Sequence, residues 1–236
     1  MAGLPELRRK EKAGTPRASR VEDAYGTLKD AILAGVFPPG YQGSEQEIAG
    51  RLGMSRTPVH EALIRLQEDG LVRVLAKRGV VVCAVSPDDV RDIYDVIRAV
   101  EPMAAELLAA QPATARRAVA DELDRLNRVM KASLARGDLV GWAKADDEFH
   151  RLLSEACGNG RITRMARTVM DQAHRARMLT LHLRATPTAS VLEHRAIIAA
   201  IRKGIAQDAQ ACARAHRTRA RDELVPLLAR VGIRHL

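Results

Sequence analysis

The stretch SEQEIAGRLGMSRTPVHEALIRLQEDGLVRVLAKRG, residues 44–79, decides the fold of the N-terminal part of the chain. Ser44 and Glu47 have the spacing of a capping box at the start of a helix. A glycine ends this helix, a second helix follows a tight turn, and another glycine ends the second helix. Two β-rich runs, 71–75 and 80–85, then surround a basic tip. This order predicts a winged helix-turn-helix.

The second of these helices keeps one face polar. Its apolar positions recur at helical spacing and form an inward face: Val59, Ala62, Leu63 and Leu66. Arg56, Thr57 and His60 lie off that face and point outward. The DNA major groove accepts an α-helix, and an arginine can bond two acceptors on one guanine edge. The sequence therefore predicts specific binding of double-stranded DNA, although helix-turn-helix sequences also occur in proteins that never touch DNA.

The residues before this motif divide into a tail and a helix. Residues 1–20 are rich in Arg, Lys, Gly and Pro and predict a flexible basic tail, which either adds phosphate contacts or is inert. A helix over 21–35 supplies further apolar residues to the same small core. The net charge of the chain is +9, but residues 1–85 carry only +3 of it and residues 86–236 carry +6. Charge alone therefore favours a polyanionic partner without locating its site.

Composition excludes several classes of protein. Cys83, Cys157 and Cys212 lie far apart without a CxxC motif, so we expect no disulfide framework and a reducing cytoplasmic setting. The sequence contains no run of about 18 apolar residues, so it predicts no membrane span. The N-terminus lacks the apolar core of a signal peptide.

From residue 86 to 232 the sequence predicts a second, all-α domain, so the fold class is mainly α. Hydrophobic residues make up 47% of the chain but aromatic residues only 3%, as is typical of helix bundles. Breaks at Gly and Pro divide this part into about six helices: 87–110, 114–135, 139–156, 160–184, 188–203 and 207–230. Trp142 is expected in their core.

Four side chains of this domain could hold a metal ion. Asp146 and His150 are four residues apart and share one helix face. His194 and His216 lie at similar distances from the turn that joins the last two helices, so they can face each other. One carboxylate and three imidazoles suit Zn²⁺, Ni²⁺, Co²⁺ or Mn²⁺. The alternative is a hydrogen-bonded Asp–His pair and ordinary core histidines.

The N-terminal motifs resemble the GntR family of bacterial transcription regulators. The resemblance rests on LKDAILAGVFPPG, on SRTPV at the second helix and on the RGV of the hairpin tip. It implies that Arg56 reads a base edge, that polar neighbours hold phosphates and that Arg78-Gly79 approaches the minor groove. The predicted DNA-contacting set is Ser44, Ser55, Arg56, Thr57, His60, Lys77, Arg78 and Gly79. Many relatives carry arginine where this chain has His60.

The helical domain is similar to the ligand-binding FCD domain of the FadR subfamily. The resemblance rests on DDEFHRLL, CGN, EHRAIIAAI and AxxAH. It implies that Asp146, His150, His194 and His216 are the ligands of a metal. Arg98 is predicted either to bind the carboxylate of an effector or to pair with Glu101. Asn159 either lines the effector pocket or caps the next helix.

Together these features predict a DNA-binding transcriptional regulator that works as a homodimer on a palindromic operator. We expect a repressor, with activation as the alternative. A small carboxylate effector bound at the metal would control its affinity for the operator. Two alternatives remain open at this point. The metal itself is the signal, or the helical domain is a metal-dependent enzyme tethered to DNA, although no HExxH-like base accompanies the four ligands.

Overall fold

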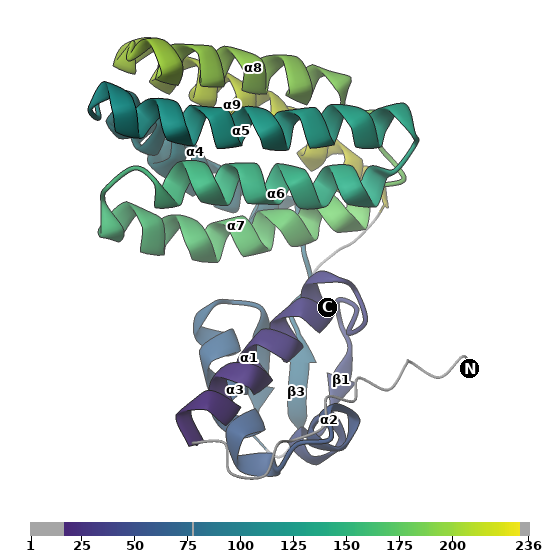
Figure 1. Ribbon diagram of the computed structural model, residues 1–236. Coiled ribbons are helices and arrows are strands. Elements are labelled where there is room, and N and C mark those ends of the chain that lie inside the picture. The colour runs from purple at the N-terminus through teal and green to yellow at the C-terminus, as the bar shows by residue number, and fades with distance from the viewer. Residues whose placement is uncertain (1–16, 77, 232–236) are drawn as a thin grey trace. The chain divides into compact units, whose positions relative to one another are not determined.

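The computed structural model describes residues 17–76 and 78–231 (Figure 1). Residues 1–16 of the predicted basic tail and the hairpin residue Lys77 lie outside the described residues. Within the described chain, one compact unit runs to Val85 and a second begins at Ser86. None of the described helices is both long enough and apolar enough to cross a membrane.

The first unit is a winged helix-turn-helix. Its elements are α1 (Arg17–Leu33), β1 (Gln42–Gly43), α2 (Glu45–Leu52), α3 (Arg56–Glu68), β2 (Val72–Leu75) and β3 (Gly79–Val82). Helix α1 begins four residues before the predicted start, so residues 17–20 are helical rather than part of the tail. Leu28 of α1, Leu52 of α2 and Leu63 of α3 lie in one apolar cluster with the sheet, which explains why three short elements hold together.

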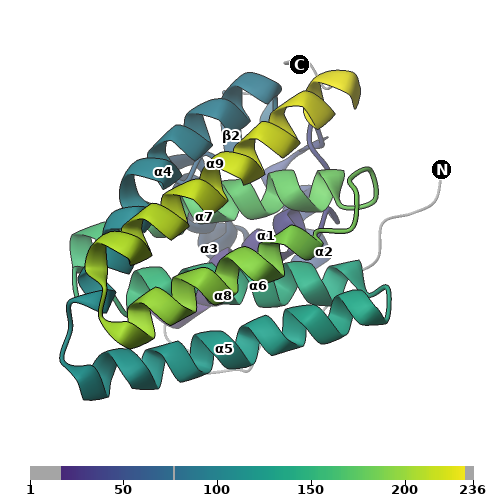
Figure 2. The ribbon, with the colours of Figure 1, turned by 90° about the horizontal axis from the view of Figure 1, so that it is seen from above.

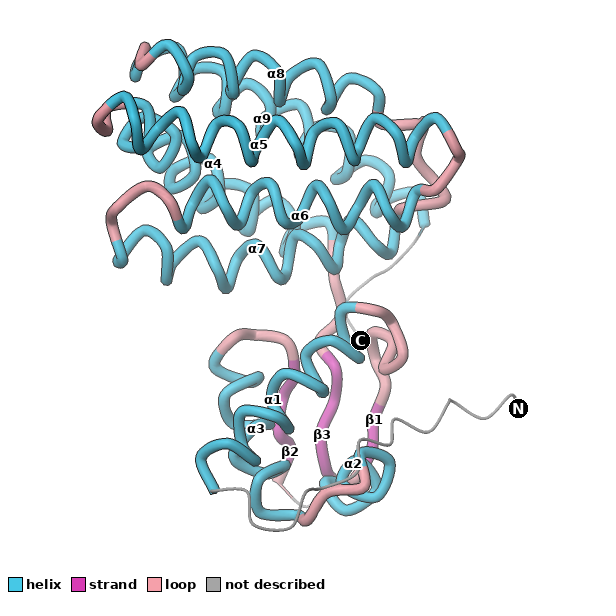
Figure 3. Tube along the Cα trace, viewed as in Figure 1, coloured by secondary structure: helices cyan, strands magenta, loops and turns pink. Residues whose placement is uncertain are grey.

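The strands form an antiparallel sheet in the order β1-β3-β2 (Figure 3). Strand β1 is too short for the sequence pattern to have predicted it, and it pairs Gly43 with Val80. Leu75 pairs with Gly79 across the hairpin tip. Gly79 has a φ of 83°, and a Cβ atom there would lie 2.4 Å from the carbonyl oxygen of Gly43. The wing therefore requires glycine at this position for its backbone angle and for the close approach of β1.

The described residues of the second unit form six helices: α4 (Pro87–Ala109), α5 (Ala113–Ala135), α6 (Leu139–Glu155), α7 (Gly160–Thr180), α8 (Thr188–Lys203) and α9 (Ala206–Val231). Their packing forms a closed ring in the order α4, α7, α6, α5, α8 and α9, and α9 returns to α4 (Figure 2). Helix α7 ends at Thr180, four residues earlier than predicted. The Thr180 hydroxyl donates to the backbone carbonyl oxygen of Ala176, as expected for a side chain that closes a last turn.

Leucine, alanine and isoleucine fill most of the bundle core, together with Trp142 and Phe149. Trp142 is only 1% exposed, so its predicted core position is confirmed. Ser86 and Asp89 form a complete capping box at the start of α4. The first helix of the bundle is thus well defined at the point where the chain enters it.

Candidate functional site

The turn between α2 and α3 presents the start of α3 to solvent. The Ser44 hydroxyl accepts a hydrogen bond from the backbone N–H of Glu47 at 3.1 Å and caps α2. The expected return bond from Glu47 is absent, because its carboxylate accepts from Tyr41 and Arg51. Gly53 ends α2 in the left-handed conformation with a φ of 64°. The chain can therefore turn at once into α3.

The described members of the predicted DNA-contacting set lie near this turn and the wing. The exposed ones are Ser44, Ser55, Arg56, Thr57, His60 and Arg78. The Arg56 side chain is 72% exposed at the first position of α3. A hollow of about 370 Å³ is lined by Ser44, Arg56 and Gly79, among other residues, so side chains from α2, α3 and the wing share one surface. Ser55 occupies the N-cap position of α3 without a side-chain capping bond.

A residue that the sequence patterns did not single out lies between two members of this set. Glu45 accepts a hydrogen bond from Nε of Arg56 at 3.2 Å, and its other oxygen lies 2.8 Å from Nδ1 of His60. Burial opposes ionisation of Glu45, but His60 and Arg56 outweigh it, so the pKa of this carboxyl is lowered. Glu45 is therefore a carboxylate that contacts both Arg56 and His60.

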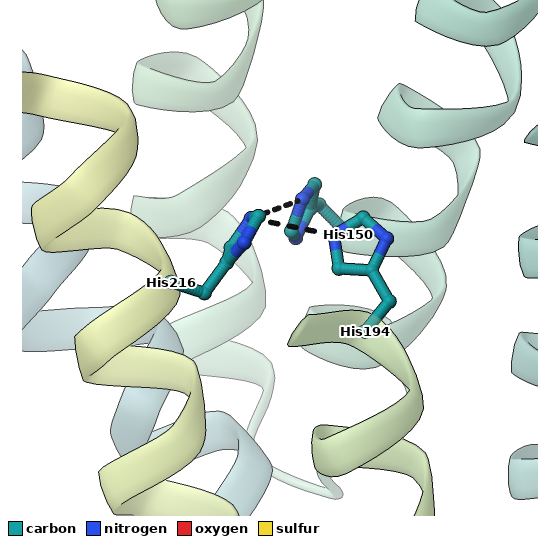
Figure 4. A group of neighbouring side chains, drawn as sticks. All are labelled: His150, His194 and His216. Carbon is teal, nitrogen blue, oxygen red and sulfur yellow. Dashed lines mark hydrogen bonds between the residues drawn. The ribbon is translucent and has the colours of Figure 1, made fainter. Parts of the chain in front are cut away.

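Three histidines meet inside the helical ring, from α6, α8 and α9 (Figure 4). The Nε2 atom of His216 lies 3.3 Å from Nε2 of His194 and 3.3 Å from Nε2 of His150. All three side chains are at most 3% exposed. The sequence prediction that these residues come together is thus confirmed by their positions. Asp146, on α6, has oxygens 3.7 Å from Nε2 of His150 and 3.9 Å from Nε2 of His194.

The spacing of the imidazoles fits one metal ion. Ligand nitrogens about 2.0–2.1 Å from a tetrahedral zinc lie about 3.3–3.4 Å apart. A carboxylate can only accept a hydrogen bond, so the 2.7 Å contact of Glu193 with Nδ1 of His216 places the proton on Nδ1. In the neutral ring, Nε2 of His216 then carries a free lone pair, and this lone pair faces the other buried Nε2 atoms. A cation at their centre would satisfy this arrangement.

Carboxylates on neighbouring helices support the cluster from outside. Glu193 of α8 contacts His216, and Oε1 of Glu101 on α4 lies 3.0 Å from Nδ1 of His150, without the alignment of a full hydrogen bond. Glu101 also receives two hydrogen bonds from Arg217. Partners of this kind orient metal-binding histidines and raise their basicity. Neither glutamate was predicted as part of the site.

Electrostatics keep the carboxylate ionised and two of the imidazoles neutral. Burial opposes ionisation of Asp146, but Arg177 and the three histidines outweigh it and hold the pKa of this carboxyl far below its usual range. An Nη1–Oδ2 distance of 3.2 Å joins Arg177 to Asp146. Burial lowers the pKa of both His150 and His194 well below the ordinary value. Neighbouring imidazoles add to this effect at both residues, and Arg217 adds to it at His150. Neutral imidazoles and an ionised carboxylate are the forms that bind metals.

The two predicted effector-binding residues lie in other contacts. Arg98 donates to Thr218 and pairs with Asp95, and the predicted alternative partner Glu101 is bound by Arg217 instead. Asn159 caps α7 through its side-chain oxygen, which was the alternative interpretation. It also lines a surface hollow of about 570 Å³ beside Gly158 and Arg161. A buried cation of α7 that was not among the predicted site residues, Arg177, lies 3.2 Å from the carboxylate of Asp146.

Comparisons with known proteins agree with both units. Residues 20–82 match the bacterial regulatory proteins of the gntR family, and residues 92–219 match the FCD domain. A relative from Agrobacterium vitis, described as an uncharacterized HTH-type transcriptional regulator in the TAR-I ttuE-ttuC' intergenic region, is 53% identical over 58% of this chain and 80% of its own length. Another from Streptomyces ambofaciens, also an uncharacterized HTH-type regulator, is 35% identical over 82% of this chain and 80% of its own.

The fold is shared with solved structures. A putative GntR transcriptional regulator from Rhodococcus sp. RHA1 is 25% identical, with a TM-score of 0.72 over 88% of this chain and 98% of that one. The two domain matches and the relatives thus define a DNA-binding transcriptional regulator rather than an enzyme. The chain belongs to the GntR family and carries an FCD domain, which is consistent with the FadR subfamily.

Proposed function

We propose that this regulator binds a palindromic DNA operator as a homodimer and that Arg56 reads a base edge. The observation that carries the proposal is the 72% exposed Arg56 side chain at the start of α3, beside exposed Ser55 and Thr57. One recognition helix contacts too few base pairs to define a site in a genome, so two copies are needed. Arg78 and Lys77 would add contacts at the wing.

This proposal is tested by selecting bound duplexes from a random pool. We expect an inverted repeat whose half-sites are separated by whole turns of DNA. Arg56→Ala should lose about 1–3 kcal/mol of preference for that repeat. Arg65→Ala is the control, because Arg65 lies on the same helix but pairs with Glu22 of α1. Unchanged operator preference in the Arg56 variant would remove this mechanism.

We propose that Asp146, His150, His194 and His216 hold a divalent transition metal: Zn, Ni, Co or Mn. The converging Nε2 atoms and the carboxylates behind them support this assignment. Such a metal supplies coordination positions for an oxygen-bearing ligand. Elemental analysis of the purified protein should find close to one metal per chain in the parent and much less in His194→Ala. His182→Ala is the control, because His182 is exposed.

The effector would be a small carboxylate metabolite that binds at the metal. Arg177 supports an anionic ligand, because its buried guanidinium lies 3.2 Å from the carboxylate of Asp146, one of the proposed metal ligands. A guanidinium accepts an incoming carboxylate in a two-pronged fork. A role of Arg98 and Asn159 in binding the effector remains a prediction. Arg98 contacts Thr218 and Asp95, and Asn159 caps α7.

Repression would follow if the operator-bound dimer blocks transcription and the effector releases it. The effector can shift operator affinity only by the difference between its affinities for the two arrangements. A screen of small carboxylates against the metal-loaded protein, read by operator binding, should find one that weakens binding. Arg177→Met should lose that response while it keeps its metal. If every carboxylate fails in the parent protein, the effector class is wrong.

A second candidate keeps the regulator but makes the metal the signal. The observation that favours it is the buried position of all four proposed ligands, which need no further group to hold an ion. Zinc, nickel, cobalt or manganese would be added separately to metal-stripped protein while operator affinity is followed. A metal sensor responds without any metabolite, whereas the favoured mechanism requires both.

A further inference from the structure

Glu45 joins the two exposed side chains through which α3 would meet DNA. It is the first residue of α2, and its side chain is 13% exposed, against 72% for Arg56 and 49% for His60. Arg56 and His60 are four residues apart, so they lie one helical turn apart on the same face of α3. One carboxylate therefore contacts Nε of Arg56 and Nδ1 of His60, while both side chains remain exposed to solvent.

The contact with His60 decides which ring nitrogen can meet a base. A carboxylate only accepts hydrogen bonds, so at a distance of 2.8 Å the proton lies on Nδ1 of His60. In the neutral ring, Nε2 is then an acceptor. In the major groove, an acceptor finds its partner in an exocyclic amine, N4 of cytosine or N6 of adenine, and not in O6 or N7 of guanine.

The contact with Arg56 leaves the opposite chemistry available. Glu45 engages Nε at 3.2 Å, so the two terminal Nη nitrogens stay outside that contact. These nitrogens donate in parallel and match O6 and N7 of guanine. The same carboxylate thus presents a donor pair at Arg56 and an acceptor at His60.

We propose that His60 reads the exocyclic amine of a cytosine or adenine and that Glu45 is the positioning residue that fixes this acceptor and aims Arg56. The inference rests on the proposed operator binding and adds the base chemistry that α3 recognises. It also explains why an acidic side chain lies among groups that approach a polyanion. Its charge is directed at Arg56 and His60 rather than at phosphates.

The amine is tested directly with base analogues in the selected operator. His60→Ala first identifies the position where base preference is lost. At that position, 2-pyrimidinone replaces cytosine or unsubstituted purine replaces adenine, which removes the amine alone. We expect the analogue to weaken binding of the parent protein about threefold to tenfold and to leave His60→Ala unaffected. An equal loss in both proteins, or a guanine as the only contacted base at that position, would overturn the proposal.

The role of Glu45 is tested by Glu45→Gln, with Glu47→Gln as the matched control. Glu47 lies on the same turn of α2, but its carboxylate contacts Tyr41 and Arg51 instead. We expect Glu45→Gln to lower the ratio of operator to random-DNA affinity about tenfold or more without weakening binding to random DNA. The control should keep the parent ratio, and Glu45→Gln should add little in an Arg56→Ala, His60→Ala background.

Two results separate the possible failures. If Glu45→Gln strengthens binding to operator and random duplex by the same factor, Glu45 is only a repulsive charge and the inference fails alone. If the parent protein enriches no sequence from the random pool, the proposed operator binding fails as well, and this is seen before any variant is made.

Discussion

Arg217 of α9 donates two hydrogen bonds to Glu101 of α4, and neither side chain is more than 2% exposed. Burial alone would lower the pKa of Arg217, but Glu101 outweighs burial and raises this pKa, so the guanidinium stays charged. The pair links two adjacent helices of the ring directly behind His150. Removal of either partner would leave a charge buried in the core.

We expect Arg217→Met to lower the free energy of unfolding by about 3–5 kcal/mol, because Glu101 would be left buried without its cation. Urea unfolding followed by circular dichroism measures this change. Arg167→Met is the control, since Arg167 and its partner Glu155 are 59% and 48% exposed. The control should lose no more than about 1 kcal/mol. Equal losses in the two variants would show that the buried pair has no special weight.

Glu193 is expected to control how tightly the histidine cluster binds a metal. Its carboxylate contacts Nδ1 of His216 at 2.7 Å, so Glu193→Gln should reduce zinc affinity about tenfold to a hundredfold. Competition with a chromophoric chelator measures this affinity. Glu155→Gln changes the same residue type on an exposed part of α6 and should bind zinc like the parent. Parent-like affinity in Glu193→Gln would mean that this contact does not orient the ligand.

Gly79 is expected to tolerate no larger side chain in the wing. Gly79→Ala would combine a positive φ with a Cβ atom 2.4 Å from Gly43, so we expect a loss of at least about 1 kcal/mol in stability. Gly26→Ala in α1 meets no atom within 4 Å and should gain about 0.5–1 kcal/mol. Thermal melting compares the two variants. A Gly79→Ala protein as stable as the parent would show that the wing can move away from β1.

The sequence predicted the parts of the fold and the site that depend on local spacing. Asp146 and His150 share a face because they are four apart on one helix, and the levels of His194 and His216 follow from the turn between α8 and α9. The cap at Ser44 likewise depends on a neighbour three residues away. The metal role of the cluster stays a prediction.

Partners that lie on other elements could not be predicted in this way. Sequence proximity suggested Arg98 for Glu101, whereas the buried partner is Arg217, 116 residues away. Glu45 and Arg56 are separated by a turn whose geometry decides their contact. Strand β1 has two residues and forms only because β3 offers its edge. In each case the tertiary packing, not the local pattern, selects the partner.

Helix α4 begins at the residue after Ser86, where the chain leaves the DNA-binding unit, and it contains Pro102 next to Glu101. Proline has no N–H, so the carbonyl of Arg98 lacks its usual helical donor. Helix α4 is therefore easier to bend at this point. A shift of His150 would displace Glu101, which lies next to this proline. We therefore expect metal loading to change amide hydrogen exchange around residues 98–103. Helix α4 would then transmit this change along the chain toward Ser86 and the DNA-binding unit.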